Sequence, residues 1–250
     1  MASKWIEIMS AGEKDRLNGV RCVETALDPL PDFDRTRVWI FDLDNTLYPA
    51  RVDLFALIDE KMGLYIQRLL DVDAVEARRV QKHYFIDHGT TLSGLMAHEG
   101  IDPHDFLDFV HDIDMSRLAP DPALNAALAK LPGRKLVFTN GDADYAGRVL
   151  AGLGLADAFD GLFDIHEAQY RPKPHPEAYS GMCRALGVEP GHALFVEDMA
   201  RNLKPAKALG MATVWVNNGS EHGSADASPD FIDFETHDLS HWLTGIMETV

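Results

Sequence analysis

Short apolar runs, each followed by polar residues, recur along the chain and predict a set of buried strands. The first run is Val38–Phe41, which ends abruptly at Asp42. Aliphatic and aromatic runs of this length are typical of strands that are covered on both faces. The same pattern predicts four further strands, at residues 135–138, 161–166, 193–196 and 212–216.

Apolar residues that recur every three or four positions predict helices between these strands. The stretch from residue 49 to residue 118 has this pattern throughout and contains no convincing strand. Within it, Asp102-Pro103 has the residue types of a helix start. Further along the chain, helical patterns alternate with the strands at 123–131, 145–153, 177–186, 201–209 and 239–247.

This alternation predicts an α/β fold in which a parallel sheet carries helices on both faces. The helical stretch would then be an insertion directly after the first strand. We therefore expect three parts: an N-terminal extension at 1–37, a core formed by 38–48 and 119–250, and an inserted helical part at 49–118. The polar residues 220–229 are expected to form a loop.

Composition narrows the range of partners. The 250 residues are 46% hydrophobic and 25% charged, which is ordinary for a globular protein, and the formal net charge is -17. A surface with this much negative charge repels nucleic-acid polymers and anionic membranes. We therefore expect a small-molecule partner. Cys22 and Cys183 lie far apart without metal-site spacing, which favours reduced thiols and a cytoplasmic location. The sequence leaves the oligomeric state open.

Residues with functional chemistry follow the predicted strands. Because parallel strands place their carboxyl ends at one edge of the sheet, these residues are expected to meet there. Two carboxylates at the mouth of a buried strand repel each other unless a cation binds them or a reaction uses them. The candidates, in chain order, are Asp42, Asp44, Thr139, Asn140, Gly141, Lys173, Glu197 and Asp198.

The segment Asp42-Leu43-Asp44-Asn45-Thr46 resembles the first signature of the haloacid dehalogenase superfamily of phosphotransferases. Continued through Tyr48-Pro49, it looks most like the pyrimidine 5'-nucleotidase-like branch. The order of acid pair, hydroxyl with Asn, lysine and acid pair is similar to the four signatures of this superfamily, over residues 38–216. The resemblance implies a Rossmann-like core and an all-helical cap, here 49–118, that closes over the active site.

The resemblance also implies catalytic roles for the first acid pair. Asp42 would be the nucleophile that forms an aspartyl-phosphate. Asp44 would protonate the leaving alcohol and then deprotonate the attacking water. Dehalogenases lack this second aspartate, so its presence here favours a phosphate ester as substrate.

Four further residues would handle the transferring phosphoryl group. Thr139 would donate a hydrogen bond to a phosphate oxygen, and the N–H groups of Asn140 and Gly141 would add to the cradle. An Asn-Gly hairpin is the alternative for this turn, but a helical pattern follows it instead of a strand. Lys173, between two prolines, would neutralise the nucleophile and the phosphoryl group; a solvated loop lysine is the alternative.

The acids suit Mg²⁺, which prefers hard oxygen ligands. By resemblance, the ion would be bound by the side chain of Asp42, the backbone carbonyl of Asp44 and an acid of the fourth signature. Asp198 is the first choice for that acid, with Glu197 either a ligand or a neighbour of one, because Glu-Asp departs from the more common Asp-Asp or Gly-Asp. The alternative for Asp198 is a helix N-cap before Ala200.

These expectations together describe a magnesium-dependent phosphomonoester hydrolase that acts through an aspartyl-phosphate. The resemblance favours a pyrimidine nucleoside 5'-monophosphate as substrate. One alternative is a sugar-phosphate phosphatase or a phosphomutase of the same superfamily, since Glu197-Asp198 also resembles the mutase version of the fourth signature. A non-catalytic binding protein on a retained fold is the alternative from another class.

Overall fold

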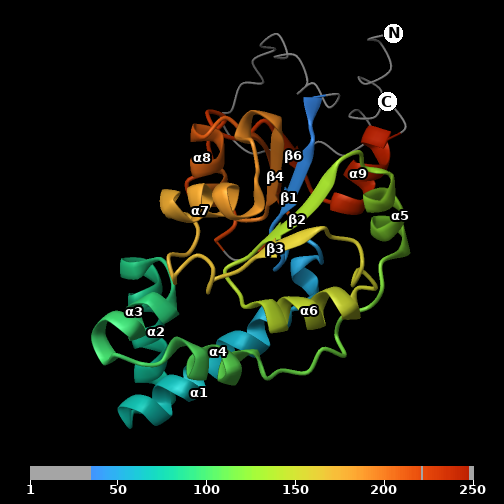
Figure 1. The fold of residues 1–250 in the computed structure, drawn as a ribbon. Helices are drawn as coiled ribbons and strands as arrows, with labels where there is room; N and C mark the ends of the chain where they lie inside the picture. Colours follow the sequence, from blue (N-terminus) through green and yellow to red (C-terminus); the bar gives the residue numbers. More distant parts are fainter. Residues whose placement is uncertain (1–34, 221, 248–250) are drawn as a thin grey trace, which may run out of the picture. The chain divides into compact units, whose positions relative to one another are not determined.

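A six-stranded parallel sheet is the centre of the computed structural model, which describes residues 35–220 and 222–247. The strand order β3-β2-β1-β4-β5-β6 is that of a Rossmann-type sheet and confirms the predicted α/β class (Figure 1). The expected N-terminal extension, 1–37, lies almost wholly outside the described residues. The strands are β1 (Val38–Phe41), β2 (Arg134–Phe138), β3 (Gly161–Phe163), β4 (Ala193–Glu197), β5 (Ala212–Val216) and β6 (Phe234–Thr236).

Helices make up the regular structure between residues 49 and 118, as the periodicity predicts. They are the short 3-10 turn η2 (Ala50–Val52) and the helices α1 (Leu54–Leu70), α2 (Ala74–His88), α3 (Thr91–Glu99) and α4 (Pro103–His111). Helix α4 begins at Pro103, and the Asp102 side chain accepts a hydrogen bond of 2.9 Å from the backbone N–H of His104. The predicted helix start is thereby confirmed.

The remaining helices cover the two faces of the sheet (Figure 1). They are α5 (Pro122–Lys130), α6 (Ala143–Gly152), α7 (Pro176–Leu186), α8 (Ala200–Ala208) and α9 (Leu239–Met247), with a 3-10 turn η3 (Pro190–His192). Tyr179 of α7 and Leu203 of α8 pack in one buried cluster with Ile40, Phe138 and Phe195 of the central strands. None of the helices in the described part of the chain is long and apolar enough to span a bilayer.

Two strands differ from the prediction. Strand β3 ends at Phe163 rather than near residue 166, because the Asp164 side chain accepts from the backbone N–H of Glu167 at 2.9 Å and begins a turn. Strand β6 was not predicted at all. Its three residues lie at the edge of the sheet and are partly or fully exposed, so they carry no apolar run that the pattern could detect.

The topology concentrates functional residues between β1 and β4. From β1 the chain adds β2 and then β3 on one side, and it returns to add β4 on the other side, so the strand order reverses there. Ligands bind in the crevice that such a reversal leaves at the carboxyl ends of the strands. In the register, Phe41 is paired with both Val137 and Val196. The residues that follow in each strand therefore meet at this crevice.

Candidate active site

Asp42 ends the central strand and remains tied to the sheet. Its backbone N–H donates to the carbonyl of Val196 at 2.9 Å, and its side chain is buried. The chain then turns sharply through Asn45, whose φ of 58° lies in the left-handed region that Asn tolerates. The turn brings back Thr46, whose hydroxyl donates to Asp42 Oδ2 at 2.9 Å. The local sequence thus fixes one oxygen of the expected nucleophile.

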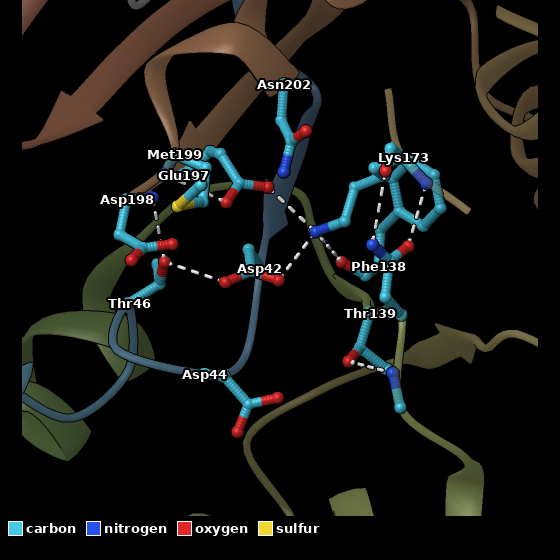
Figure 2. Close-up of polar contacts among 12 residues, drawn as sticks. Asp42, Asp44, Thr46, Phe138, Thr139, Lys173, Glu197, Asp198, Met199 and Asn202 are labelled. Carbon is cyan, nitrogen blue, oxygen red and sulfur yellow. Dashed lines mark hydrogen bonds and ion pairs between the residues drawn. The ribbon is translucent and has the colours of Figure 1, made fainter. Parts of the chain in front are cut away.

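Lys173 fixes the other oxygen. Its Nζ atom lies 2.5 Å from Asp42 Oδ1 and 2.7 Å from Glu197 Oε2, between the two carboxylates (Figure 2). The third donor position of the ammonium group is used by the carbonyl of Phe138, at 2.9 Å. Only 1% of the side chain is exposed, so the alternative of a solvated loop lysine is wrong. The rings of Phe138 and Phe195 lie 5.1 and 5.5 Å from Nζ and shield it further.

The turn after β2 holds the backbone of Lys173 in place through hydrogen bonds. Asn140 Oδ1 accepts from the backbone N–H of Lys173 at 2.8 Å, and Asn140 Nδ2 donates to the carbonyl of Lys173 at 3.3 Å. The N–H of Gly141 donates to Thr139 Oγ1 at 2.9 Å. Helix α6 follows this turn, so the hairpin alternative is wrong. The side chain of Asn140 thus positions Lys173, and this role of Asn140 was not predicted from the sequence.

Three carboxylates gather beside Lys173. One oxygen each from Asp42, Glu197 and Asp198 lie within 4.8 Å of one another, and all three residues are buried. Glu197 Oε1 also accepts from the N–H of Met199 at 3.1 Å. Met199 is the N-cap of α8 and makes no side-chain cap, so the N-cap alternative for Asp198 is wrong. The backbone N–H of Asp198 instead donates to Thr46 Oγ1 at 3.1 Å.

The charges of this cluster do not balance. Burial and the neighbouring charge of Glu197 raise the pKa of Asp42 to about 7, although Lys173 opposes the shift. Burial, Glu197 and Asp42 likewise raise the pKa of Asp198 well above its usual range. Burial would lower the pKa of Lys173, but the carboxylates of Asp42 and Glu197 outweigh it and raise that pKa. The three carboxylates share only one positive charge, that of Lys173. Their hard oxygen donors therefore fit a small divalent metal ion.

Asp198 differs from the other two acids in its ion pairing. Asp42 and Glu197 both pair with Lys173, whereas Asp198 makes no ion pair with any residue that the structure describes. Asp198 could therefore offer its carboxylate to a cation, whereas Glu197 is the partner of Lys173.

Asp44 stands apart from this cluster (Figure 2). Its Oδ1 atom accepts hydrogen bonds from two phenols, Tyr48 and Tyr145, each at 2.6 Å. Burial and the charge of Asp44 raise the pKa values of both phenols well above 10, so both remain protonated donors. Neither tyrosine was predicted from the sequence to be functional. The four-residue spacing from Asp44 to Tyr48 could have suggested a contact, but nothing in the sequence pairs Asp44 with Tyr145.

Comparison with known proteins agrees with this geometry. The family model of the haloacid dehalogenase-like hydrolases matches residues 36–210. Phosphate metabolism protein 8 of Saccharomyces cerevisiae is 32% identical over 75% of this chain, which spans 64% of the yeast protein's length. Glyceraldehyde 3-phosphate phosphatase of Methanopyrus kandleri is 29% identical over 77% of this chain and 90% of its own. An (S)-2-haloacid dehalogenase of Xanthobacter autotrophicus is 31% identical over half of each chain.

A solved structure shares the fold. The phosphatase of this family from Thermococcus onnurineus superposes with a TM-score of 0.59 at 20% identity, over 84% of this chain and 98% of its own. The family match covers most of the chain, including the ends of β1, β2 and β4, where the buried acids, Thr139 and Lys173 converge. The chain therefore belongs to the haloacid dehalogenase-like hydrolases.

Proposed function

We propose that this hydrolase cleaves phosphate monoesters through an aspartyl-phosphate on Asp42. The observation that carries the proposal is the separation of two carboxylates two residues apart. Asp42 is buried against Lys173 and two further acids, whereas Asp44 accepts hydrogen bonds from two tyrosines outside that cluster. Neighbouring carboxylates in different environments are suited to different roles, one as nucleophile and one as acid and base.

The reaction proceeds in two displacements. In the first, an Asp42 carboxylate oxygen bonds to phosphorus, the ester P–O bond breaks, and Asp44 gives a proton to the departing alcohol oxygen. In the second, Asp44 takes a proton from water, the water oxygen bonds to phosphorus, and the bond to Asp42 breaks. Lys173 holds Asp42 in place through Oδ1. Thr139, buried at the end of β2, donates to a phosphoryl oxygen.

We further propose that Mg²⁺ is the cation that fits the acidic cluster. Asp42 and Asp198 would hold it through side-chain oxygens, and Asp44 through its backbone carbonyl. When bound, it would neutralise negative charge on the phosphoryl group and keep Asp42 ionised. Addition of Mg²⁺ should raise the melting temperature of the wild-type protein, and Asp198→Asn should reduce this shift. An equal shift in both proteins would contradict the assignment of Asp198.

We propose that the helical segment 49–118 is a cap that selects the substrate, a nucleoside 5'-monophosphate with a pyrimidine base. The segment from Asp42 to Pro49, which resembles the pyrimidine 5'-nucleotidase-like branch, supports this choice. The phosphatase relative from Methanopyrus kandleri is named for a small phosphate ester, and this name supports a small phosphate ester as the substrate class of the present chain. A sugar-phosphate phosphatase or a mutase remains the second candidate, because of Glu197-Asp198.

Phosphate release from a panel of nucleotides, sugar phosphates and 4-nitrophenyl phosphate tests the proposal, with Mg²⁺ and with excess chelator. Fast release from UMP and CMP that depends on Mg²⁺ would support the nucleotidase. A sugar-biased profile would leave the phosphatase and discard the nucleotide. Halide release from 2-chloropropionate without phosphate release would overturn the phosphatase in favour of dehalogenation.

A further inference from the structure

Two buried phenols converge on a single oxygen of Asp44. Tyr48 and Tyr145 each place their hydroxyl 2.6 Å from Oδ1, and their side chains are 2% and 0% exposed. Hydrogen bonds of this length from a hydroxyl to a carboxylate are among the stronger ones in proteins. Phenol donors have only two side-chain torsions, so buried tyrosines hold an acceptor in a narrow range of positions.

The two tyrosines come from separate parts of the fold. Tyr48 lies in the turn after β1, four residues beyond Asp44, whereas Tyr145 lies in α6. The Asp44 side chain is thus bridged between the turn that carries it and a helix that follows β2. Rotation of its carboxylate away from this position would break both hydrogen bonds at once.

Tyr145 is held in turn by its own neighbours. Its ring stacks on the imidazole of His111, at a centroid distance of 4.2 Å and an interplanar angle of 15°. Its backbone N–H donates to Asp142 Oδ1 at 2.7 Å, and Asp142 Oδ2 pairs with His111 Nδ1. A Cβ at Gly141 would lie 3.0 Å from the Tyr145 ring, so Gly141 packs closely against this ring.

We infer that Tyr48 and Tyr145 are positioning residues that hold Asp44 through Oδ1 and leave Oδ2 to exchange protons with the leaving oxygen and with water. This inference rests on the proposed phosphatase mechanism, which gives Asp44 its role as acid and base. With Oδ1 occupied by two donors, Oδ2 is the oxygen that carries the transferable proton. Both tyrosines act through Asp44 and need no contact with the substrate.

The loss of activity in each tyrosine variant should depend on the leaving group of the ester. An alkyl alcohol leaves poorly without a proton, whereas 4-nitrophenolate leaves readily without one. Loss of either hydroxyl in Tyr48→Phe or Tyr145→Phe should therefore lower kcat/KM about tenfold for an alkyl ester. For 4-nitrophenyl phosphate the loss should stay below about threefold. The alkyl ester used is the one that the wild-type protein cleaves fastest.

Tyr84→Phe is the matched control, because its phenol donates to Glu99 at 2.9 Å in the helical segment and does not contact Asp44. It should leave the ratio of kcat/KM for the two esters unchanged. Melting temperatures of all variants separate loss of fold from loss of positioning. Because each tyrosine is tested alone, a folding failure of one variant still leaves the other as a test.

An Asp44→Asn background supplies a second readout that a purely structural role would not move. If Tyr48 acts through the Asp44 carboxylate, Tyr48→Phe should cause less than a twofold further loss in this background, on the order expected for a fully coupled pair. An equal loss on both esters, or a full tenfold loss in both backgrounds, would overturn the inference. Absence of phosphate release by the wild-type protein would instead overturn the proposed function on which it rests.

Discussion

The strand ends and the helical segment differ sharply in burial. Every residue of β1 and β4 is buried, and so are Asp42, Asp198 and Lys173 beside the ends of these strands. In α1, by contrast, three of 17 residues are buried. The helical segment also contains most of the large hydrophobic side chains that are exposed in the described part of the chain, namely Phe55, Leu64, Leu69, Val75 and Ile86.

This difference separates two requirements of a hydrolase. Chemistry needs atoms held within a fraction of an ångström, which close packing at the strand ends provides. Selection of a substrate needs surface that can change and move, and a segment with few buried contacts opens at lower free energy than the core. The proposed division into a reactive core and a selective cap follows from this contrast, and six substitutions, two of them controls, test it.

The largest effect is expected from Asp42→Asn. Loss of the nucleophile should lower kcat by at least about 10⁴-fold, as for other covalent nucleophiles. The fold should be retained, because the change removes one of three crowded negative charges. Single-turnover phosphate release measures the loss of activity, and a thermal melt of the same sample checks that the fold is retained. Turnover near that of the wild-type protein would exclude Asp42 as the nucleophile.

Replacement of Lys173 compares a fully buried cation with the partly exposed cation of Lys61. Lys173→Met leaves Asp42 and Glu197 without their cation and should reduce the free energy of unfolding by about 3–5 kcal/mol. The matched control Lys61→Met removes an ion pair with Asp112, 3.2 Å away on the surface of the helical segment, and should cost less than about 1 kcal/mol. Urea unfolding measures the loss of stability in both variants. Equal losses would contradict the proposed difference between the strand ends and the helical segment.

Truncation of a leucine makes the same comparison for apolar packing. Leu194 of β4 is fully buried, and Leu194→Ala should destabilise the fold by about 2–5 kcal/mol. Leu64 of α1 is 38% exposed, so Leu64→Ala should cost less than about 1 kcal/mol. The difference in urea midpoint between the two variants is the measurement. A costly Leu64→Ala would show that a further surface covers this helix.

The smallest effect concerns Asp142, which pairs with His111 at the end of α4. Burial is the largest single effect and opposes ionisation of Asp142. The hydrogen bond and charge of His111 and the hydrogen bond from the backbone N–H of Tyr145 together outweigh burial and lower the pKa of Asp142. A lowered pKa stabilises the fold above the unfolded value of about 3.9, and this stability is lost as pH falls through the folded pKa.

Asp142→Asn keeps the N-cap acceptor of α6 and removes only the charge. It should cost about 1 kcal/mol at mildly acidic pH, and the cost should shrink below about pH 4. Urea unfolding of both proteins across this pH range is the measurement. A cost that grows toward lower pH would contradict the assignment of the stabilising charge to Asp142.

The sequence predicted those parts of the fold that depend on local patterns. Apolar runs located β1, β2, β4 and β5, and Asp102-Pro103 located the start of α4. Strand β6 was not predicted, because an exposed edge strand of three residues has no such apolar run. Its place in the sheet is set by parallel pairing with β5, which is a property of the whole fold.

The candidate site shows the same division. The spacing of the signatures predicted that Asp42, Lys173, Glu197 and Asp198 meet, and the structure brings them together. The contact between Tyr145 and Asp44 joins residues 101 positions apart and depends on how α6 packs beside the turn after β1. Hydrogen bonds of this kind have no signature in the sequence, since either partner alone is an ordinary residue.

The burial of Lys173 also determines how its amine reacts with chemical labels. Acylating reagents need access and an unprotonated nitrogen, and Lys173 offers neither while it lies between Asp42 and Glu197. Exposed lysines such as Lys130 and Lys204 react from the folded state. Acylation at Lys173 therefore requires the strand ends to open, and its rate relative to Lys130 reports how often they do so.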